Sequence, residues 1–364
     1  MTTTTADLTG NDAPVLVRRE GRAGHLTLNR PAALNALTFE MVRLLTEALQ
    51  AWRSDPAVEM VILDGAGGRA LCAGGDIIDL TGQRSDPSKP WRQFWREEYQ
   101  LNALIHRYPK PFVALMDGIV MGGGIGLSAH ARHRIVTEKS MLAMPETGIG
   151  LIPDVGGTWL LGHAQGELGT YLGLTGARMN GSDAIQCGFA SDYVTSDRVA
   201  ALVERLCGAN DSDCAEVIEA FTEVSPVPAS PLAARRPEID RFFGFDTVEA
   251  ILDALNTSPS EFAQKTRGEL QRKSPKALKL ALAAMRRAKS LANLEACLNM
   301  EYRLVIRLYE DGEFPEGVRA LLIDKDKAPK WNPATLGEVS DAMLGSYFAP
   351  FLPSAELGLV APKM

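Results

Sequence analysis

The chain has 364 residues, of which 46% are hydrophobic, and a formal net charge of −7 from 38 basic and 45 acidic side chains. Its length and apolar content predict a globular protein with one large domain and an appendage. The acidic balance disfavours binding to nucleic acid or to an anionic membrane. An anionic ligand must therefore meet helix N-termini or local basic side chains, for which Arg30 and Lys139 are candidates.

Short apolar runs separated by turns dominate the first part of the chain. Apolar patterns predict one helix over residues 39–52, and strands over residues 15–19, 25–29, 60–63, 112–116 and 134–137. The repetition of two strands and a helix with short connections predicts an α/β core.

The composition changes near residue 225. Residues 225–237 are rich in Pro, Ala and Ser, which predicts a linker or loop. Helical periodicity follows over residues 261–273, 275–289 and 291–310. The predicted organisation is a core at 1–225, a Pro/Ala-rich connecting segment at 226–260 and a helical C-terminal region at 261–364.

Two glycine clusters each follow a predicted strand. Residues 70–76 come after the strand at 60–63, and residues 117–127 come directly after the strand at 112–116. Glycine-rich turns at strand ends expose backbone N–H groups without a side chain in the way. Two such groups from separate loops form an oxyanion hole, which stabilises an enolate or a tetrahedral oxyanion.

Residues 144–157 place two carboxylates, Glu146 and Asp154, in a segment dense with glycine and proline. Glycine allows backbone to approach a ligand, and apolar neighbours raise the basicity of a carboxylate, as a general base requires. The alternative is that Asp154 caps a helix starting near Val155 and that Glu146 is a solvated turn residue.

A family resemblance rests on several motifs taken together. The sequence resembles the crotonase (enoyl-CoA hydratase/isomerase) superfamily through residues 29–31, 35–37, 72–76, 122–124 and 145–146. Within it, the chain is most similar to the 3-hydroxyisobutyryl-CoA hydrolases, through residues 96–99, 145–157, 300–303, 316–320, 323–326 and 329–331. The resemblance implies a fold made as a spiral of ββα turns.

One departure distinguishes between members of this superfamily. The hydratases that the chain resembles carry a catalytic glutamate where this chain has Gly126, and glycine cannot move a proton. They usually have glycine at the position of Asp154, where the hydrolase subgroup has aspartate. An ordinary hydratase mechanism is therefore disfavoured unless Glu98 or Asp154 substitutes.

The resemblance implies an acyl-CoA thioester hydrolase whose substrate is 3-hydroxyisobutyryl-CoA, an intermediate of valine breakdown. The amides of Gly75 and Gly123 would form the oxyanion hole, while Glu146 either activates water or attacks the thioester. Asp154 would orient that water or the substrate hydroxyl. Further substrate contacts are expected at Glu98, Gly74, Asp76 and Gly122. For Glu98, a carboxylate on a helix surface is the alternative.

No cofactor is expected, because CoA is part of the substrate, and a homo-oligomer is suggested by family members that assemble through their C-terminal helices.

Two other functions stay open: an enoyl-CoA hydratase or isomerase, and a noncatalytic acyl-CoA-binding protein. The run Gly65–Ala70 matches a dinucleotide-binding fingerprint, but no amphipathic helix follows it. A G-x-S-x-G serine hydrolase motif does not occur.

The five cysteines are an odd number without Cys-x-x-Cys spacing, which fits a reducing compartment. Cys72 is interpreted as a buried packing residue rather than a nucleophile, since no local motif supplies a histidine. His130 and His133 would share one helix face, but no third metal ligand is signalled and no metal is expected. The first dozen residues resemble neither a secretory nor a transit peptide, and no apolar run is long enough to span a membrane, so a cytoplasmic protein is expected.

Overall fold

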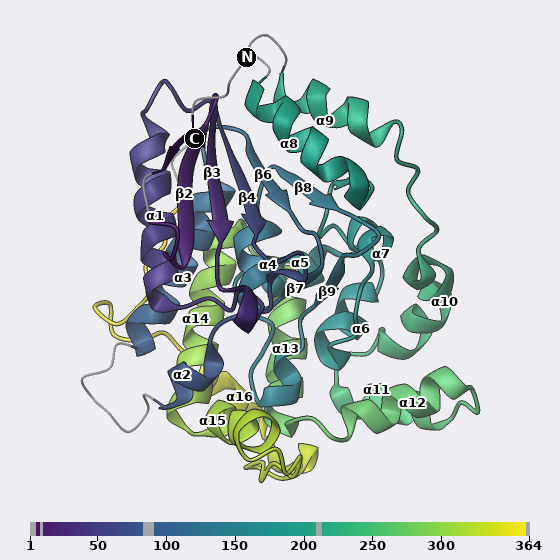
Figure 1. The fold of residues 1–364 in the computed structure, drawn as a ribbon. Helices are drawn as coiled ribbons and strands as arrows, with labels where there is room; N and C mark the ends of the chain where they lie inside the picture. The colour runs from purple at the N-terminus through teal and green to yellow at the C-terminus, as the bar shows by residue number, and fades with distance from the viewer. Residues whose placement is uncertain (1–4, 8–9, 83–90, 209–212, 362–364) are drawn as a thin grey trace. The chain divides into compact units, whose positions relative to one another are not determined.

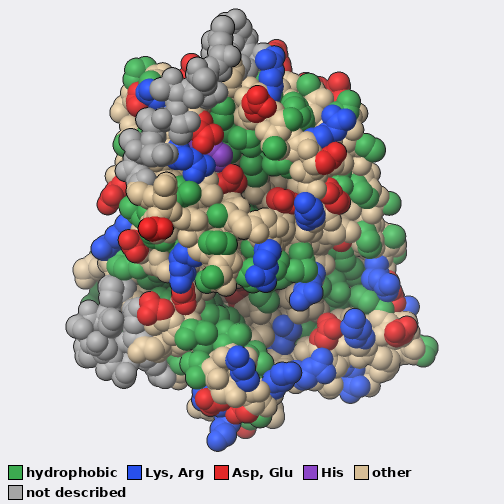
Figure 2. Space-filling model, viewed as in Figure 1, with side chains coloured by type: hydrophobic (Ala, Val, Ile, Leu, Met, Phe, Trp, Pro, Cys, Tyr) green, Lys and Arg blue, Asp and Glu red, His purple; other side chains and the backbone are tan. Residues whose placement is uncertain are grey.

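The computed structural model describes residues 5–7, 10–82, 91–208 and 213–361 (Figure 1). The chain forms two compact units that interleave along the sequence. Unit 1 comprises Met1–Asp76, Gln100–Leu142 and Met179–Pro231, and unit 2 comprises Ile77–Tyr99, Ala143–Arg178 and Leu232–Met364. The division expected at residues 225 and 260 stays a prediction. Figure 2 shows basic and acidic side chains interspersed on the visible face.

Unit 1 contains a seven-stranded sheet in the order β1-β2-β3-β4-β6-β8-β10. The pairs β1–β2 and β2–β3 are antiparallel, and the remaining pairs are parallel. The strands are β1 (Thr5–Asp7), β2 (Val15–Glu20), β3 (Ala23–Leu28), β4 (Met60–Gly65), β6 (Phe112–Leu115), β8 (His133–Val136) and β10 (Asp192–Tyr193). Strand β6 and the first four residues of β4 are apolar and buried, as expected for parallel strands that are covered on both faces.

A second sheet has the order β5-β7-β9, from β5 (Ala70–Cys72), β7 (Ile119–Met121) and β9 (Met141–Ala143). Strands that follow one another along the chain alternate between the sheets: β4, β6 and β8 lie in the large sheet, and β5, β7 and β9 in the small one. Helices come after each pair, namely α2 (Ile77–Gly82) and α3 (Trp91–His106), then α4 (Gly123–Ser128), then α5 (Gly157–His163). This is the predicted ββα repetition.

The core of unit 1 lies between the large sheet and two helices, α8 (Val199–Gly208) and α9 (Cys214–Thr222). Met60 and Ile62 of β4 belong to one buried cluster with Leu202 and Leu206 of α8. Figure 1 shows α8 and α9 beside β8. Burial of each such aliphatic side chain contributes about 1.5–3 kcal/mol. The unit also contains α1 (Phe39–Arg53), capped by Thr38, and α7 (Gly181–Gln186).

Unit 2 is mainly helical. Besides α2 and α5 it contains α6 (Leu168–Thr175), α10 (Pro231–Phe243), α11 (Val248–Asn256), α12 (Glu261–Leu270), α13 (Pro275–Ala288), α14 (Leu294–Glu310), α15 (Glu313–Val318) and α16 (Asp341–Phe348). Helix α13 packs against α5 and α6. Glycine allows this close approach, because a Cβ at Gly162 would lie only 3.0 Å from the Met285 carbonyl oxygen.

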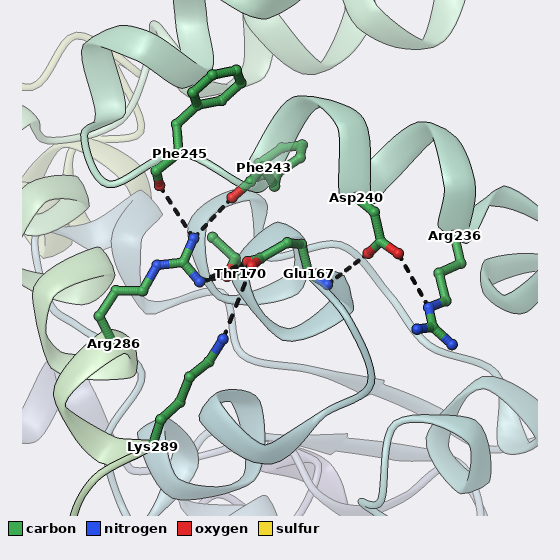
Figure 3. A network of polar contacts seen from close by, with 8 residues as sticks. All are labelled: Glu167, Thr170, Arg236, Asp240, Phe243, Phe245, Arg286 and Lys289. Atoms are coloured by element: carbon green, nitrogen blue, oxygen red, sulfur yellow. Dashed lines mark hydrogen bonds and ion pairs between the residues drawn. The ribbon is translucent and has the colours of Figure 1, made fainter.

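A polar network ties α6, α10 and α13 together (Figure 3). The guanidinium of Arg286 donates to Glu167 Oε2 at 2.7 Å and to the Phe243 carbonyl oxygen at 2.9 Å. The Glu167 amide in turn donates to Asp240 Oδ1 at 2.7 Å. These contacts place a partly buried ion pair between helices, and the two terminal nitrogens of Arg286 bind different segments and so fix their relative orientation.

Most expected elements are confirmed with small shifts at their ends. The helix predicted over 39–52 is α1, and the three predicted C-terminal helices are α12, α13 and α14. The linker over 225–237 is partly wrong, because α10 begins at Pro231 and contains Pro237. Burial of Leu232, Ile239 and Phe243 supplies the packing that offsets a proline within a helix. Among the described helices, none combines the length and apolar character needed to cross a bilayer.

Candidate active site

A short 3-10 helix, η2 (Glu146–Ile149), places Glu146 at its first residue. It ends at Gly150, whose φ of 73° is left-handed, and the Leu151 amide donates back to the Glu146 carbonyl oxygen at 3.0 Å. A Cβ at Gly150 would lie 2.4 Å from the Glu313 carbonyl oxygen, so both the dihedral and the space require glycine. Glu146 is 5% exposed, and the solvated-turn interpretation is therefore wrong.

Asp154 precedes a sharp turn into α5. Val155 and Gly156 both have positive φ, 52° and 80°, and α5 begins at Gly157 with Gly156 as its N-cap and no side-chain cap. The helix-cap interpretation of Asp154 is therefore wrong. Its Oδ2 instead accepts a hydrogen bond from the Tyr99 hydroxyl at 2.7 Å, and the side chain is buried.

Helix α3 presents Glu98 and Tyr99 to the interior of unit 2. Glu98 is 3% exposed and Tyr99 is fully buried, as are their neighbours Phe94 and Trp95. The alternative in which Glu98 is a surface carboxylate is therefore wrong. From the sequence alone the two interpretations of Glu98 were equally good, because Glu97 and Glu98 lie in a charged amphipathic segment.

The carboxylates of this unit have perturbed proton affinities. Burial, and secondarily the charge of Asp154, hold the pKa of Glu98 and that of Glu146 well above the ordinary range. Burial also raises the pKa of Asp154 to about 7, against the opposing hydrogen bond from Tyr99. Titratable groups whose pKa values are displaced by burial and by one another are typical of catalytic sites.

Two further features of the site are the Oε2 atom of Glu146 and the nearby side chain of Lys273. Glu146 Oε2 is buried and receives no hydrogen bond from the part of the chain that the structure describes. Lys273 Nζ would lie 3.6 Å from a Cβ at Gly148, so its ammonium sits over η2. Burial lowers the pKa of Lys273 to about 8, while Glu146 acts to raise it. A carboxylate oxygen of raised basicity and without a donor is suited to accept a proton.

The two glycine loops of unit 1 lie close together. The Leu37 amide donates to the Gly74 carbonyl oxygen at 2.8 Å, and the Asp76 amide donates to the Leu37 carbonyl oxygen at 2.9 Å. Backbone N–H groups alternate in direction along an extended segment, so the Gly75 amide points away from Leu37. A Cβ at Gly74 would lie 4.0 Å from the Gly123 nitrogen, across the space between the loops.

The second loop supplies the amide of Gly123. Gly122 has a φ of 47° and is the N-cap of α4, so Gly123 is the first helical residue, whose N–H has no acceptor within the helix. Gly126 is buried within α4. The Arg30 guanidinium donates to Asp76 at 3.0 Å. Arg30, a candidate for binding an anionic ligand, therefore lies against the first loop.

Other expectations on single residues have mixed outcomes. Cys72 is fully buried, which confirms its packing role, and all five cysteines are free. The shared helix face for His130 and His133 is wrong, since α4 ends at Ser128 and His133 begins β8. Residues 66–69 turn from β4 directly into β5, so no helix follows the apparent dinucleotide fingerprint.

Sequence reasoning assigned no role to Tyr99, Lys273 or Glu301. Glu301 lies on α14, where its Oε2 accepts from the Gly156 amide at 2.7 Å. A signal for Glu301 existed, because it continues the buried stripe that Cys297 and Leu298 form on the same helix. A carboxylate on an apolar helix face indicates burial with specific partners.

The family described as enoyl-CoA hydratase/isomerase matches residues 23–348. The chain therefore belongs to the enoyl-CoA hydratase/isomerase family, and its fold is the crotonase-like α/β fold expected from the sequence.

Individual relatives are similar over nearly the whole chain. The mitochondrial 3-hydroxyisobutyryl-CoA hydrolase of Rattus norvegicus is 43% identical over 342 residues, which is 92% of this chain and 89% of that protein. The crystal structure of a carnitinyl-CoA dehydratase from Mycobacterium thermoresistibile has 44% identity and a TM-score of 0.89, covering 96% of this chain and 98% of that one. An enoyl-CoA hydratase from Rhodobacter sphaeroides has 42% identity and a TM-score of 0.87, covering 95% and 100%.

Proposed function

We propose that this chain is an acyl-CoA thioester hydrolase that converts 3-hydroxyisobutyryl-CoA to 3-hydroxyisobutyrate and CoA, a step of valine catabolism. The buried Asp154, held by Tyr99 in the same unit as Glu146, is the observation that carries the proposal. Support also comes from the name of the rat relative and from Gly126, which lacks the carboxylate of the hydratase pattern.

In the proposed mechanism, the amides of Gly75 and Gly123 polarise the thioester carbonyl and stabilise its oxyanion. Glu146 accepts a proton from water as the water oxygen bonds to the carbonyl carbon, and the C–S bond then breaks. The proton passes to the departing thiolate, which leaves as the CoA thiol. In the open alternative, Glu146 attacks first and forms a mixed anhydride that water hydrolyses.

Asp154 orients the water or the 3-hydroxyl group in this proposal, and Glu98 contributes a polar contact to the acyl group. Gly74, Asp76 and Gly122 are proposed to contact the substrate from the glycine loops. The raised pKa of Glu146 supports its role, because burial makes this carboxylate a stronger base than an exposed glutamate. The reaction consumes only water, so we propose that it needs no cofactor.

A thiol-release assay over short acyl-CoA substrates, with and without a 3-hydroxyl group, tests the proposal. We expect CoA release to be fastest with 3-hydroxyisobutyryl-CoA. Loss of the conjugated absorbance of crotonyl-CoA without any thiol release would identify a hydratase and reject the hydrolase. Tight binding of acyl-CoA with every thioester intact would identify a noncatalytic binding protein.

Hydration of an enoyl-CoA is the second candidate function. Two solved structures similar to this chain are named as a dehydratase and a hydratase, and unit 2 buries more than one carboxylate. In that reaction Glu146 and either Glu98 or Asp154 would hold the water between them. The absence of a side chain at Gly126 favours hydrolysis over this alternative.

Location and assembly are further proposals. The polar N-terminal residues supported a cytoplasmic location, and residues 1–4 and 8–9 lie outside the described residues. The name of the rat relative places that protein in mitochondria, so cell fractionation of the native protein decides between the compartments. A homo-oligomer through the C-terminal helices is tested by sedimentation at several protein concentrations.

A further inference from the structure

Glu301 makes an unusual set of contacts for a carboxylate on a C-terminal helix. Its Oε2 accepts from the Gly156 amide at 2.7 Å, and its Oε1 accepts from the Thr158 amide at 2.9 Å and the Thr158 hydroxyl at 2.5 Å. The side chain is fully buried. Together with Cys297 Sγ, which donates to Oε1 at 3.8 Å, these donors satisfy most of the hydrogen-bonding capacity of the carboxylate and offset part of the cost of burying it.

These contacts hold the turn that immediately follows Asp154. Val155 has a φ of 52°, which a β-branched residue adopts only at an energetic cost of about 1–3 kcal/mol. Such a conformation persists only where the surroundings fix it. Glu301 binds the two backbone amides on either side of Gly157, and the Gly157 amide donates to the Asp154 carbonyl oxygen at 2.6 Å.

We propose that Glu301 is a positioning residue for the reaction: its carboxylate binds the Gly156 and Thr158 amides and thereby fixes the direction of the Asp154 side chain. Tyr99 of α3 donates to Oδ2 of that side chain, while Glu301 of α14 binds the Gly156 and Thr158 amides of the turn that follows Asp154. This inference rests on the proposed function for its catalytic consequence, although the contact itself does not depend on it.

Glu167 provides a matched control. It is also a glutamate of unit 2 with charged and hydroxyl partners, Arg286 and Thr170, which lie on α13 and α6 and not in the turn at residues 155–158 (Figure 3). A glutamine at either position replaces a carboxyl group with an amide and preserves side-chain size. Any general loss of stability is therefore represented in both variants, whereas the turn after Asp154 is affected in only one.

Hydrogen exchange tests the contact without any need for activity. In Glu301→Gln, one acceptor oxygen becomes an NH2 group that faces an amide donor, so the peptide containing residues 155–160 should exchange about 10-fold faster than in the wild type. Glu167→Gln should leave that peptide within about twofold of the wild type. Unchanged exchange in folded Glu301→Gln would overturn the proposal.

A double-mutant cycle tests the action through Asp154. Glu301→Gln should lower kcat about 10- to 100-fold with KM within about twofold, the scale expected when a catalytic group is misplaced. In an Asp154→Asn background, the same change should lower kcat by less than about twofold, because the residue to be positioned is already lost. Glu167→Gln should have the same small effect in both backgrounds.

Additive effects of Glu301→Gln and Asp154→Asn would show a structural role and overturn the proposal. If Glu301→Gln does not fold, Thr158→Val and Thr158→Ser replace it: the valine should lower kcat and the serine, which keeps the hydroxyl donor, should restore it. Equal kcat for these two variants would contradict the proposal. If the wild type transforms no acyl-CoA, the proposed function fails, and the exchange experiment still decides whether Glu301 fixes the turn.

Discussion

One buried cluster in unit 1 and one in unit 2 treat charge in opposite ways. In unit 1, His25 of β3 is 4% exposed and lies between Glu20 at 3.1 Å and Asp64 at 2.9 Å. Burial alone lowers the pKa of His25, but the hydrogen bonds to Asp64 and Glu20 outweigh it and raise the pKa to about 9. The hydrogen bond from His25 in turn lowers the pKa of Glu20 to about 2.

In unit 2, Glu98 and Glu146 are buried and the charge of Asp154 repels each of them, whereas the buried Glu313 of the same unit is paired with Lys276 at 3.3 Å. Burial, together with the charge of Asp154, raises the pKa of Glu98 and of Glu146. Burial raises the pKa of Glu301 to about 8, although Thr158 and the Gly156 amide donate to it. A compensated buried charge stabilises the fold, whereas an uncompensated one is costly and is typical of a site that moves protons.

The largest expected effect is on Glu146. Glu146→Gln keeps the shape of the side chain but removes its basicity, so turnover should fall by about 10³-fold or more while acyl-CoA binding survives. Thiol release and equilibrium binding measured on the same preparation check this prediction. Near-native turnover would show that the raised proton affinity of Glu146 is not used in the reaction.

In the proposed reaction, the glycine loops of unit 1 contribute backbone amide donors rather than buried carboxylates. Gly75→Pro or Gly123→Pro removes one amide donor and should lower turnover about 10²-fold or more, the scale of losing one oxyanion donor. Circular dichroism establishes whether each variant is folded. A folded variant with normal thiol release would exclude that amide from the oxyanion hole.

The cluster of His25 with Glu20 and Asp64, whose charges compensate one another, predicts a loss of stability that depends on pH. The folded pKa of His25, about 9, lies above its unfolded value of 6.5, so its contribution is complete below pH 6.5 and is lost as the pH rises through about 9. His25→Gln should therefore destabilise the protein by about 3 kcal/mol at pH 6 and by much less at pH 10.

Urea denaturation at both pH values measures this effect. His163→Gln is the matched control, because that ring is exposed and its Nδ1 lies 2.8 Å from the carbonyl oxygen of Trp159 on its own helix. An equal loss of stability in His25→Gln at pH 6 and pH 10 would contradict a charged, compensated His25.

Asp154, which lies in the cluster of buried carboxylates, predicts a smaller effect on stability: its replacement should stabilise the protein, whereas replacement of His25 should destabilise it. The folded pKa of Asp154, about 7, lies above its unfolded value of 3.8, so the ionised side chain disfavours the fold increasingly as the pH rises from about 4 through 7. Asp154→Asn should raise the free energy of unfolding by about 1 kcal/mol at pH 8, with the gain disappearing near pH 4. A stability loss at pH 8 would break the comparison between the units.

Local patterns predicted much of the fold. Apolar runs located β2, β3, β4, β6 and β8 but not the short strands β5, β7 and β9, and helical periodicity located α12, α13 and α14. The prediction of a loop failed over residues 231–237, where packing prevails over composition. Helix α10 contains Pro237, but burial of its Ile239 and Phe243 side chains stabilises the helix. Because those contacts come from other helices, no count of Pro, Ala and Ser within the segment indicates them.

The candidate site was located by short motifs, and its partners were not. Glu146 and Asp154 lie eight positions apart in one glycine-rich segment, which is visible in the sequence. The Tyr99 hydroxyl that binds Asp154 comes from 55 residues away, and the Glu301 carboxylate that binds the Gly156 amide comes from 145 residues away. Such pairings depend on how distant helices pack, so no local pattern specifies them.

The sequence by itself determined the ββα repetition and the residue types available for chemistry: glycines after strands and carboxylates in a glycine-rich segment. Only the tertiary structure decided which carboxylates are buried, which proton affinities are raised, and that Asp154 binds Tyr99 rather than capping α5. The physical reason is that desolvation and hydrogen bonding depend on neighbours from distant segments, whereas strand and helix patterns depend on residues only a few positions apart.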